Sequence, residues 1–131
     1  MPKWVNEGET RTLQILFGSQ AVDPNVYLGL YTNTTEPLEG DNLASISEPS
    51  GFGYARKTLA RGSWVITDDH ADFAQQILTC VGGAWGNVYG YFIATSIDGS
   101  GKLLCVEHFS NGPYNVQDGG SVKVTPKITC A

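Results

Sequence analysis

The stretch from Asn87 to Phe109, NVYGYFIATSIDGSGKLLCVEHF, decides the fold class because it predicts a β-hairpin. Two apolar runs, 87–95 and 102–109, flank the turn sequence DGSG at 98–101. Runs that are rich in β-branched and aromatic residues favour strands, and a short connection that contains glycine is typical of hairpins. The sequence therefore predicts antiparallel β-structure.

Further strands are predicted on both sides of this hairpin, at 27–31, 54–59, 63–67, 71–80 and 121–130. The last one alternates clearly, with three apolar residues on one face: Val122, Val124 and Ile128. Pro126 within it indicates a sheet edge or a bulge, because proline cannot donate to a strand ladder. Short strands at this spacing predict an all-β fold, a two-sheet β-sandwich, with either a jelly-roll or an immunoglobulin-like strand order.

The N-terminal segment departs from this pattern and predicts a short α-helix over about 7–17. Asn6 is a favourable N-cap, and Glu9 follows at the spacing of a capping box. Three apolar residues then share one face at helical spacing: Leu13, Leu16 and Phe17. We expect the helix to cover one end or one face of a sheet, with this face packed on the sheet.

Length and composition indicate a single domain, 1–131, that folds without a membrane. Charged residues make up only 16% of the chain, and the net charge is −5, which does not favour nucleic-acid binding. No apolar run is long enough to span a bilayer, and the N-terminus lacks a signal-peptide pattern. We therefore expect a soluble protein that is made in the cytoplasm.

Residues 32–53 form a long acidic loop between the predicted strands. It contains Glu36, Glu39, Asp41 and Glu48, but neither lysine nor arginine. Loops of this length inside a compact domain are often functional. We interpret it as an arm that reaches a partner, so that deleting part of it should leave the fold intact but abolish partner binding.

The three cysteines Cys80, Cys105 and Cys130 are too few and too widely spaced for a disulfide framework or a zinc site. Each follows or lies within an apolar run, so we expect buried free thiols.

Catalytic motifs are not found in the sequence, and no enzymatic activity, cofactor or metal is predicted. His108 lies in an apolar strand and is expected to be structural. The segment 67–72 contains four residues that could bind a hard cation: Asp68, Asp69, His70 and Asp72. The same composition suits a polar turn, which is the simpler interpretation.

The segment 82–91 places Trp85, Tyr89 and Tyr91 among glycines. These rings could form an exposed platform that stacks on sugars or packs on a protein. Alternatively, Trp85 folds back onto the β-body. The sequence leaves both interpretations open.

Several pieces together resemble small structural proteins of tailed bacteriophages, including cyanobacterial phages. These pieces are NEGE at 6–9, YLGLYTN at 27–33, GYAR at 53–56, WGNVYGYF at 85–92, the strand 103–109 and VKVTP at 122–126. The resemblance implies a virion component that is assembled in the host cytoplasm, such as a capsid decoration (cement) protein or a fibre-associated module. It implies no particular functional residue.

The leading hypothesis is therefore a non-enzymatic virion protein that binds the outer capsid surface and stabilises it. Its expected partners are the major capsid protein, other virion proteins and further copies of itself. The candidate contact residues are Trp4, Glu36, Glu39, Asp41, Trp85, Tyr89 and Tyr91. The alternative is a head-fibre, tail or baseplate module that binds a host receptor or a carbohydrate through the three aromatic residues.

Overall fold

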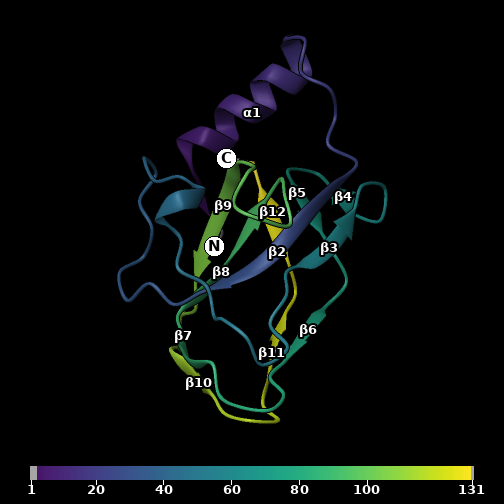
Figure 1. Ribbon diagram of the computed structural model, residues 1–131. Coiled ribbons are helices and arrows are strands. Elements are labelled where there is room, and N and C mark those ends of the chain that lie inside the picture. The colour runs from purple at the N-terminus through teal and green to yellow at the C-terminus, as the bar shows by residue number, and fades with distance from the viewer. Residues whose placement is uncertain (1–2, 131) are drawn as a thin grey trace.

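The computed structural model describes residues 3–130 and shows a mostly β chain with one α-helix (Figure 1). In chain order the elements are β1 (Lys3–Trp4), α1 (Asn6–Phe17), β2 (Asn25–Tyr31), a 3-10 helix (Leu43–Ser45), β3 (Lys57–Ala60), β4 (Val65–Thr67), β5 (His70–Asp72), β6 (Gln76–Thr79), β7 (Gly86–Val88), β8 (Gly90–Ala94), β9 (Leu103–His108), β10 (Tyr114–Val116), β11 (Ser121–Val124) and β12 (Lys127–Thr129). The predicted mainly-β class with an N-terminal helix is confirmed.

A five-stranded antiparallel sheet with the order β1-β9-β8-β2-β3 forms the centre of the molecule. The predicted hairpin is present as β8 and β9, which pair from Gly90 with His108 to Ala94 with Leu103. The apolar run before its turn divides into two strands, because β7 pairs with β10 instead of joining the sheet. β1 and β10 have only two and three residues, too few to show an alternating pattern in the sequence.

The predicted strands 71–80 and 121–130 form a long antiparallel ribbon that is interrupted once. β6 pairs with β11, and β5 pairs with β12, with β4 on its outer side. Between these ladders, residues 73–75 lie opposite residues 125–126, so one strand carries one more residue than the other. Pro126 has no N–H for the ladder, but its carbonyl accepts a hydrogen bond from the Phe73 N–H at 3.0 Å. Of the two alternatives predicted at Pro126, a sheet edge or a bulge, the structure shows a bulge in the ladder, with the extra residue in the opposite segment 73–75.

Buried side chains form two apolar clusters that take alternate residues of the central strands. Leu28, Leu30 and Ile93 belong to the first cluster, together with residues of the β6–β11 and β7–β10 ribbons. Tyr31 and Phe92 belong to the second. Each face of the sheet therefore has its own core.

The acidic loop 32–53 is part of the fold rather than a free arm. Leu43 is buried in the second cluster. The Asn33 side-chain amide donates to the Ser45 carbonyl at 2.8 Å, and its oxygen accepts the Ser47 N–H at 2.8 Å. The expectation that part of the loop can be removed without affecting the fold is wrong, because this loop covers one face of the sheet; its contact with a partner stays a prediction. Deleting part of it would expose core residues instead of leaving the fold intact.

Arg56 connects this loop to the β8–β9 turn from a buried position. Its guanidinium donates to both carboxylate oxygens of Glu48, at 3.0 and 2.8 Å. It also donates to the carbonyls of Ser96 at 2.8 Å and Asp98 at 2.7 Å. The guanidinium carbon lies 5.0 Å from the centre of the Phe92 ring. One side chain thus holds two connections against the sheet.

Helix α1 is fixed to the body at its first turn, by contacts that differ from the predicted capping box. Val5 occupies the N-cap position and is fully buried. The Asn6 N–H donates to the Glu39 carbonyl at 2.8 Å, and the Glu7 carboxylate accepts the Leu103 N–H at 2.7 Å. The helix therefore begins at Asn6 because tertiary contacts hold this turn. Of the helices in residues 3–130, none combines the length and the apolar character that a membrane span requires.

Candidate docking surface

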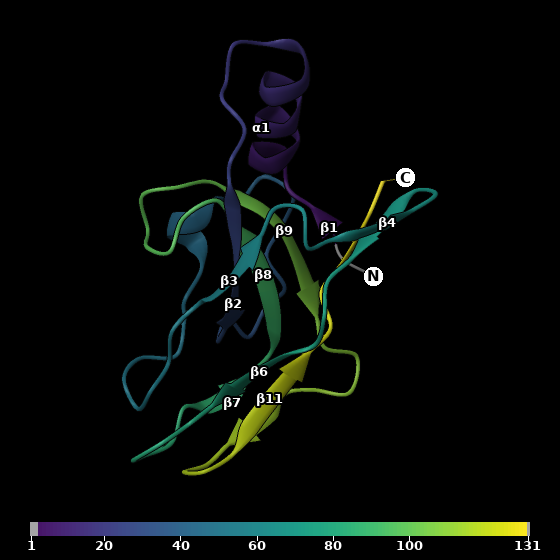
Figure 2. The same cartoon turned by 90° about the vertical axis from the view of Figure 1, so that its right-hand side faces the viewer.

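Helix α1 extends away from the sheet (Figure 2). Three of its apolar side chains are exposed to solvent. Leu13, Leu16 and Phe17 are 58%, 66% and 83% exposed. The prediction that this face packs on a sheet is wrong, since only Gly8 of the helix is buried. Exposed neighbouring apolar side chains are typical of interaction sites. We call α1 with these three side chains the helix arm.

The hairpin of β4 and β5 forms a second apolar projection (Figure 2). Val65 and Ile66, both in the outer strand β4, are 63% and 70% exposed. At the base of the hairpin, the Trp64 and Phe73 rings meet edge to face with centroids 5.1 Å apart. We call Val65–Thr67 with β5 the hairpin arm.

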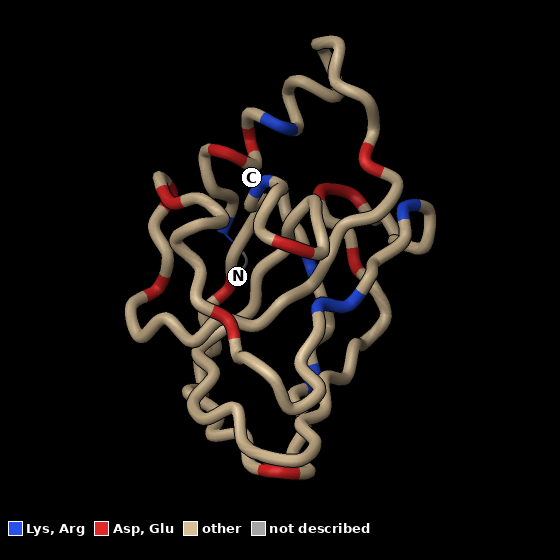
Figure 3. The backbone as a smooth tube through the Cα atoms, in the orientation of Figure 1, with Lys and Arg blue, Asp and Glu red and all other residues tan. Residues whose placement is uncertain are grey.

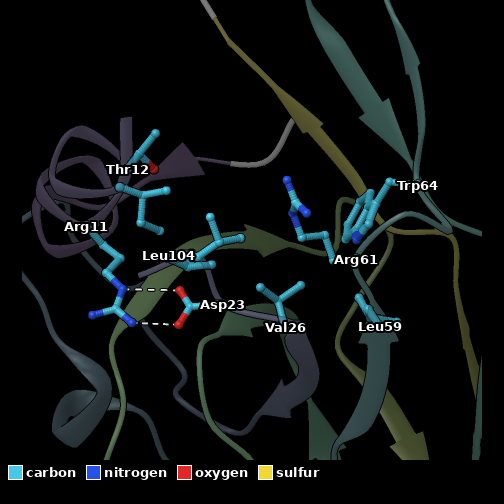
Figure 4. A pocket seen from close by; sticks show the side chains of 10 residues that line it. Arg11, Thr12, Asp23, Val26, Leu59, Arg61, Trp64 and Leu104 are labelled. Carbon is cyan, nitrogen blue, oxygen red and sulfur yellow. Dashed lines mark hydrogen bonds and ion pairs between the residues drawn. The ribbon is translucent and has the colours of Figure 1, made fainter. Parts of the chain in front are cut away.

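A cavity of about 210 Å³ lies at the base of the helix arm (Figure 4). Val26, Leu59 and Leu104 supply apolar walls, and Arg61 and Trp64 stand together on the side away from α1. We call this space the Trp64 cavity.

On the helix side of the Trp64 cavity, Arg11 is held by Asp23 through two hydrogen bonds of 3.1 and 2.6 Å. Hydrogen bonding to Asp23 raises the pKa of Arg11, as expected for an ion pair with two hydrogen bonds. Of the charged residues that line this cavity, Arg61 therefore has no side-chain partner within residues 3–130.

A second cavity of about 340 Å³ lies beside the same helix and is lined by Trp4, Glu9, Thr12, Leu13 and Cys130. Trp4 is oriented by a 3.0 Å hydrogen bond from its Nε1 to the Thr129 carbonyl. Thr12 contributes to both cavities, which are therefore neighbours at the base of α1.

Two charged groups at these cavities have no partner within residues 3–130. Neither the Arg61 guanidinium nor the Glu9 carboxylate takes part in a hydrogen bond or an ion pair there. Charges elsewhere on the chain are distributed around the upper part of the molecule, whereas the end formed by β6, β7, β10 and β11 carries few (Figure 3). Together the two arms, the two cavities, Glu9 and Arg61 make up the docking surface.

Of the predicted contact residues, one lies at the docking surface, three lie in the acidic loop, and three lie in or against the core. Trp4 lines the second cavity. Glu36 and Glu39 are exposed, and Glu36 pairs with Lys3 of β1 at 3.7 Å. Asp41 is occupied within its own loop, where its carboxylate accepts the Leu38 N–H at 2.7 Å. Only Trp4 among these four lies at the docking surface.

The predicted aromatic platform is not present. Trp85 and Tyr91 are 8% and 4% exposed and belong to the first cluster. The Trp85 Nε1 donates to the Gly51 carbonyl at 3.1 Å, and the Tyr91 hydroxyl donates to Glu107. Burial raises the pKa of Tyr91, so it stays a neutral donor. Tyr89 packs against the other cluster, and the alternative that Trp85 folds back onto the body is confirmed.

The other residues of interest have local structural roles. Asp68 takes a positive φ of 51° in the β4–β5 turn. His70 lies 3.3 Å from Asp69 and 3.4 Å from Asp72. Within residues 3–130, no three His, Cys, Asp or Glu side chains are grouped so that they could hold a metal ion. Nδ1 of His108 lies 2.9 Å from the Tyr31 hydroxyl.

Cys80 and Cys105 are buried, as expected, and burial raises the pKa of Cys105 to about 12. The expectation is wrong for Cys130, which is exposed. It follows the last strand, β12, and lies at the rim of the second cavity.

The sequence contained a signal for the helix arm, because Leu13, Leu16 and Phe17 form a visible stripe. Periodicity does not say whether such a stripe faces the molecule's own core or a partner. Arg61 and Trp64 gave no signal, since their proximity to α1 depends on tertiary structure.

A comparison with protein families, with curated proteins and with solved structures found no match.

Proposed function

We propose that this chain is a non-enzymatic structural protein of a tailed-phage virion, a decoration protein that binds the outer capsid surface and reinforces it. The observation that carries the proposal is the pair of apolar arms projecting from a β-rich body. The sequence resemblance to phage structural proteins supplies the biological setting. The major capsid protein and further copies of the chain are the proposed partners.

The architecture suits a protein that works by adding interface. The central sheet has a core on each face, so we propose that the sheet and the ribbons act as the layers of a β-sandwich that serves as a rigid support. Burying the arms against neighbouring subunits would gain about 25 cal/mol for each Å² of apolar surface removed from water. Repeated over a symmetric lattice, that gain would oppose outward pressure on the shell.

The alternative of a receptor- or carbohydrate-binding module loses its main support in this geometry. It relied on Trp85, Tyr89 and Tyr91 as a stacking platform, and two of these rings are core residues. The exposed apolar side chains of the arms favour protein partners over sugars, because protein interfaces bury apolar cores.

The hairpin arm provides a direct test of capsid binding. We expect the double variant Val65→Thr, Ile66→Thr to bind capsids at least about tenfold more weakly, because buried apolar anchors dominate interface energies. Threonine keeps the strand preference of valine and isoleucine, so the fold should persist. The measurement is co-sedimentation with undecorated capsids of the source phage.

The matched control is Ile97→Thr, which changes a residue of similar exposure in the β8–β9 turn. The control should bind like the wild type. Equal binding by the hairpin variant and the wild type would contradict a role of the hairpin arm in capsid binding.

A further inference from the structure

The Trp64 cavity has the size and lining of a site for an aromatic side chain. Its volume is about 210 Å³, and an apolar cavity of about 150 Å³ already holds a benzene molecule. Val26, Leu59 and Leu104 offer apolar contacts, and Trp64 offers an aromatic one. The Arg61 guanidinium, which has no partner within residues 3–130, can lie over the face of an entering ring.

Phe17 is the best candidate for that ring among the exposed residues of the chain. It is the most exposed of the large apolar side chains in residues 3–130 and lies at the outer end of α1. It cannot reach the cavity of its own chain. Arg11 and Ile15, one turn apart, line that cavity, and helical geometry turns Phe17 about 200° away from Ile15. A Phe17 ring in this cavity must therefore come from another copy.

The unpaired charges give the surface the self-complementarity that a symmetric dimer requires. In a two-fold dimer, each contact between two different residues occurs twice. Glu9 lines one cavity and Arg61 lines the neighbouring one, at the base of the same helix. A second copy brings an acid to each Arg61 and an arginine to each Glu9. One exchange thus pairs the two charged side chains at the cavities that have no partner within residues 3–130.

We propose that the chain forms a two-fold dimer in which Phe17 of each copy enters the Trp64 cavity of the other, with Glu9 and Arg61 paired across the interface. The inference rests on the docking surface of the proposed function and names its first partner as a second copy of this chain. The helix arm and the cavities are used within the dimer. The hairpin arm of each copy is left to contact the capsid.

The first test is the oligomeric state of the purified chain by sedimentation equilibrium. The wild type should be a dimer, and Phe17→Lys should weaken dimerisation by at least about tenfold, the usual effect of losing a buried aromatic anchor. Lysine is a good helix former and suits a helix C-terminus, so circular dichroism should show an unchanged fold. Val81→Lys, at an exposed position outside the surface, is the matched control and should remain dimeric.

The second test reverses the charges. Arg61→Glu and Glu9→Arg should each weaken the dimer, because each places like charges across the interface twice. The double variant should recover most of the wild-type affinity, since the pair is restored with opposite polarity. Lys123→Glu, an exposed lysine on β11, controls for net charge and should have no effect.

Three results would overturn the dimer: a wild type that is monomeric at all concentrations, a dimer insensitive to Phe17→Lys, or no recovery in the double variant. Its failure is distinguishable from failure of the proposed function. If the chain is a monomer that binds capsids, only the dimer proposal is contradicted. If the chain forms a dimer that is weakened by Phe17→Lys as expected but does not bind capsids, the dimer stands and only the capsid role is contradicted.

Discussion

Arg56→Ala is expected to lower the free energy of unfolding by about 3 kcal/mol, the cost of leaving one partner of a buried ion pair without the other. Alanine would remove four hydrogen bonds, two to Glu48 and one each to the carbonyls of Ser96 and Asp98. Among the contacts of residues 3–130, Glu48 would keep only its hydrogen bond from the Tyr54 hydroxyl. Urea denaturation followed by tryptophan fluorescence measures the loss.

Arg56→Lys is the matched variant for this prediction. Lysine keeps the charge but lacks the planar guanidinium that contacts both Glu48 oxygens. The free energy of unfolding of this variant should therefore lie between those of the wild type and of Arg56→Ala. A loss below about 1 kcal/mol for Arg56→Ala would show that the loop and the turn are held by other contacts, since exposed ion pairs contribute that little.

Gly8→Ala should destabilise the protein by about 1–3 kcal/mol, the usual cost of overpacking, although alanine is the better helix former. A Cβ at this position would overlap the Leu104 carbonyl oxygen and Cα, which belong to the backbone of β9. That backbone is fixed in the sheet, so α1 would have to move. Because this turn directs the helix arm, the substitution should also weaken the dimer.

The measurement for Gly8→Ala is urea unfolding together with sedimentation. Gly99→Ala serves as the control, because a Cβ there meets no neighbouring atom, and it should change neither quantity appreciably. A more stable Gly8→Ala variant would contradict the close helix–sheet contact, since propensity alone predicts a gain of about 1 kcal/mol.

The parts of the fold that sequence reasoning predicts are those with local signals. The DGSG turn marks the β8–β9 hairpin, and Pro126 marks the bulge, because turn geometry and a missing N–H act within a few residues. The predicted helix, about 7–17, is close to the observed α1, Asn6–Phe17, because the glycine that ends it, Gly18, directly follows its last residue. Such features depend on neighbouring residues and not on the rest of the chain.

The parts that were not predicted depend on what packs against a pattern. The apolar stripe of Leu13, Leu16 and Phe17 indicates a helix with one apolar face. The direction in which this helix leaves the sheet, and so whether the face is buried, depends on the close contact of Gly8 with β9. The anchors of the acidic loop, Leu43 and Glu48, are single residues in a stretch without periodicity, so the sequence gives no signal that the loop packs on the body. Trp85 among flexible glycines gave no sign that its Nε1 reaches Gly51.

The most direct test of the central claim is the number of copies of this chain per particle, measured by quantitative mass spectrometry of purified virions of the proposed source, a tailed phage that encodes the chain. The proposed function predicts a fixed whole-number ratio to the major capsid protein, because a decoration protein occupies equivalent sites on the capsid lattice. The chain's absence from the particle, or a copy number unrelated to that lattice, would contradict the claim.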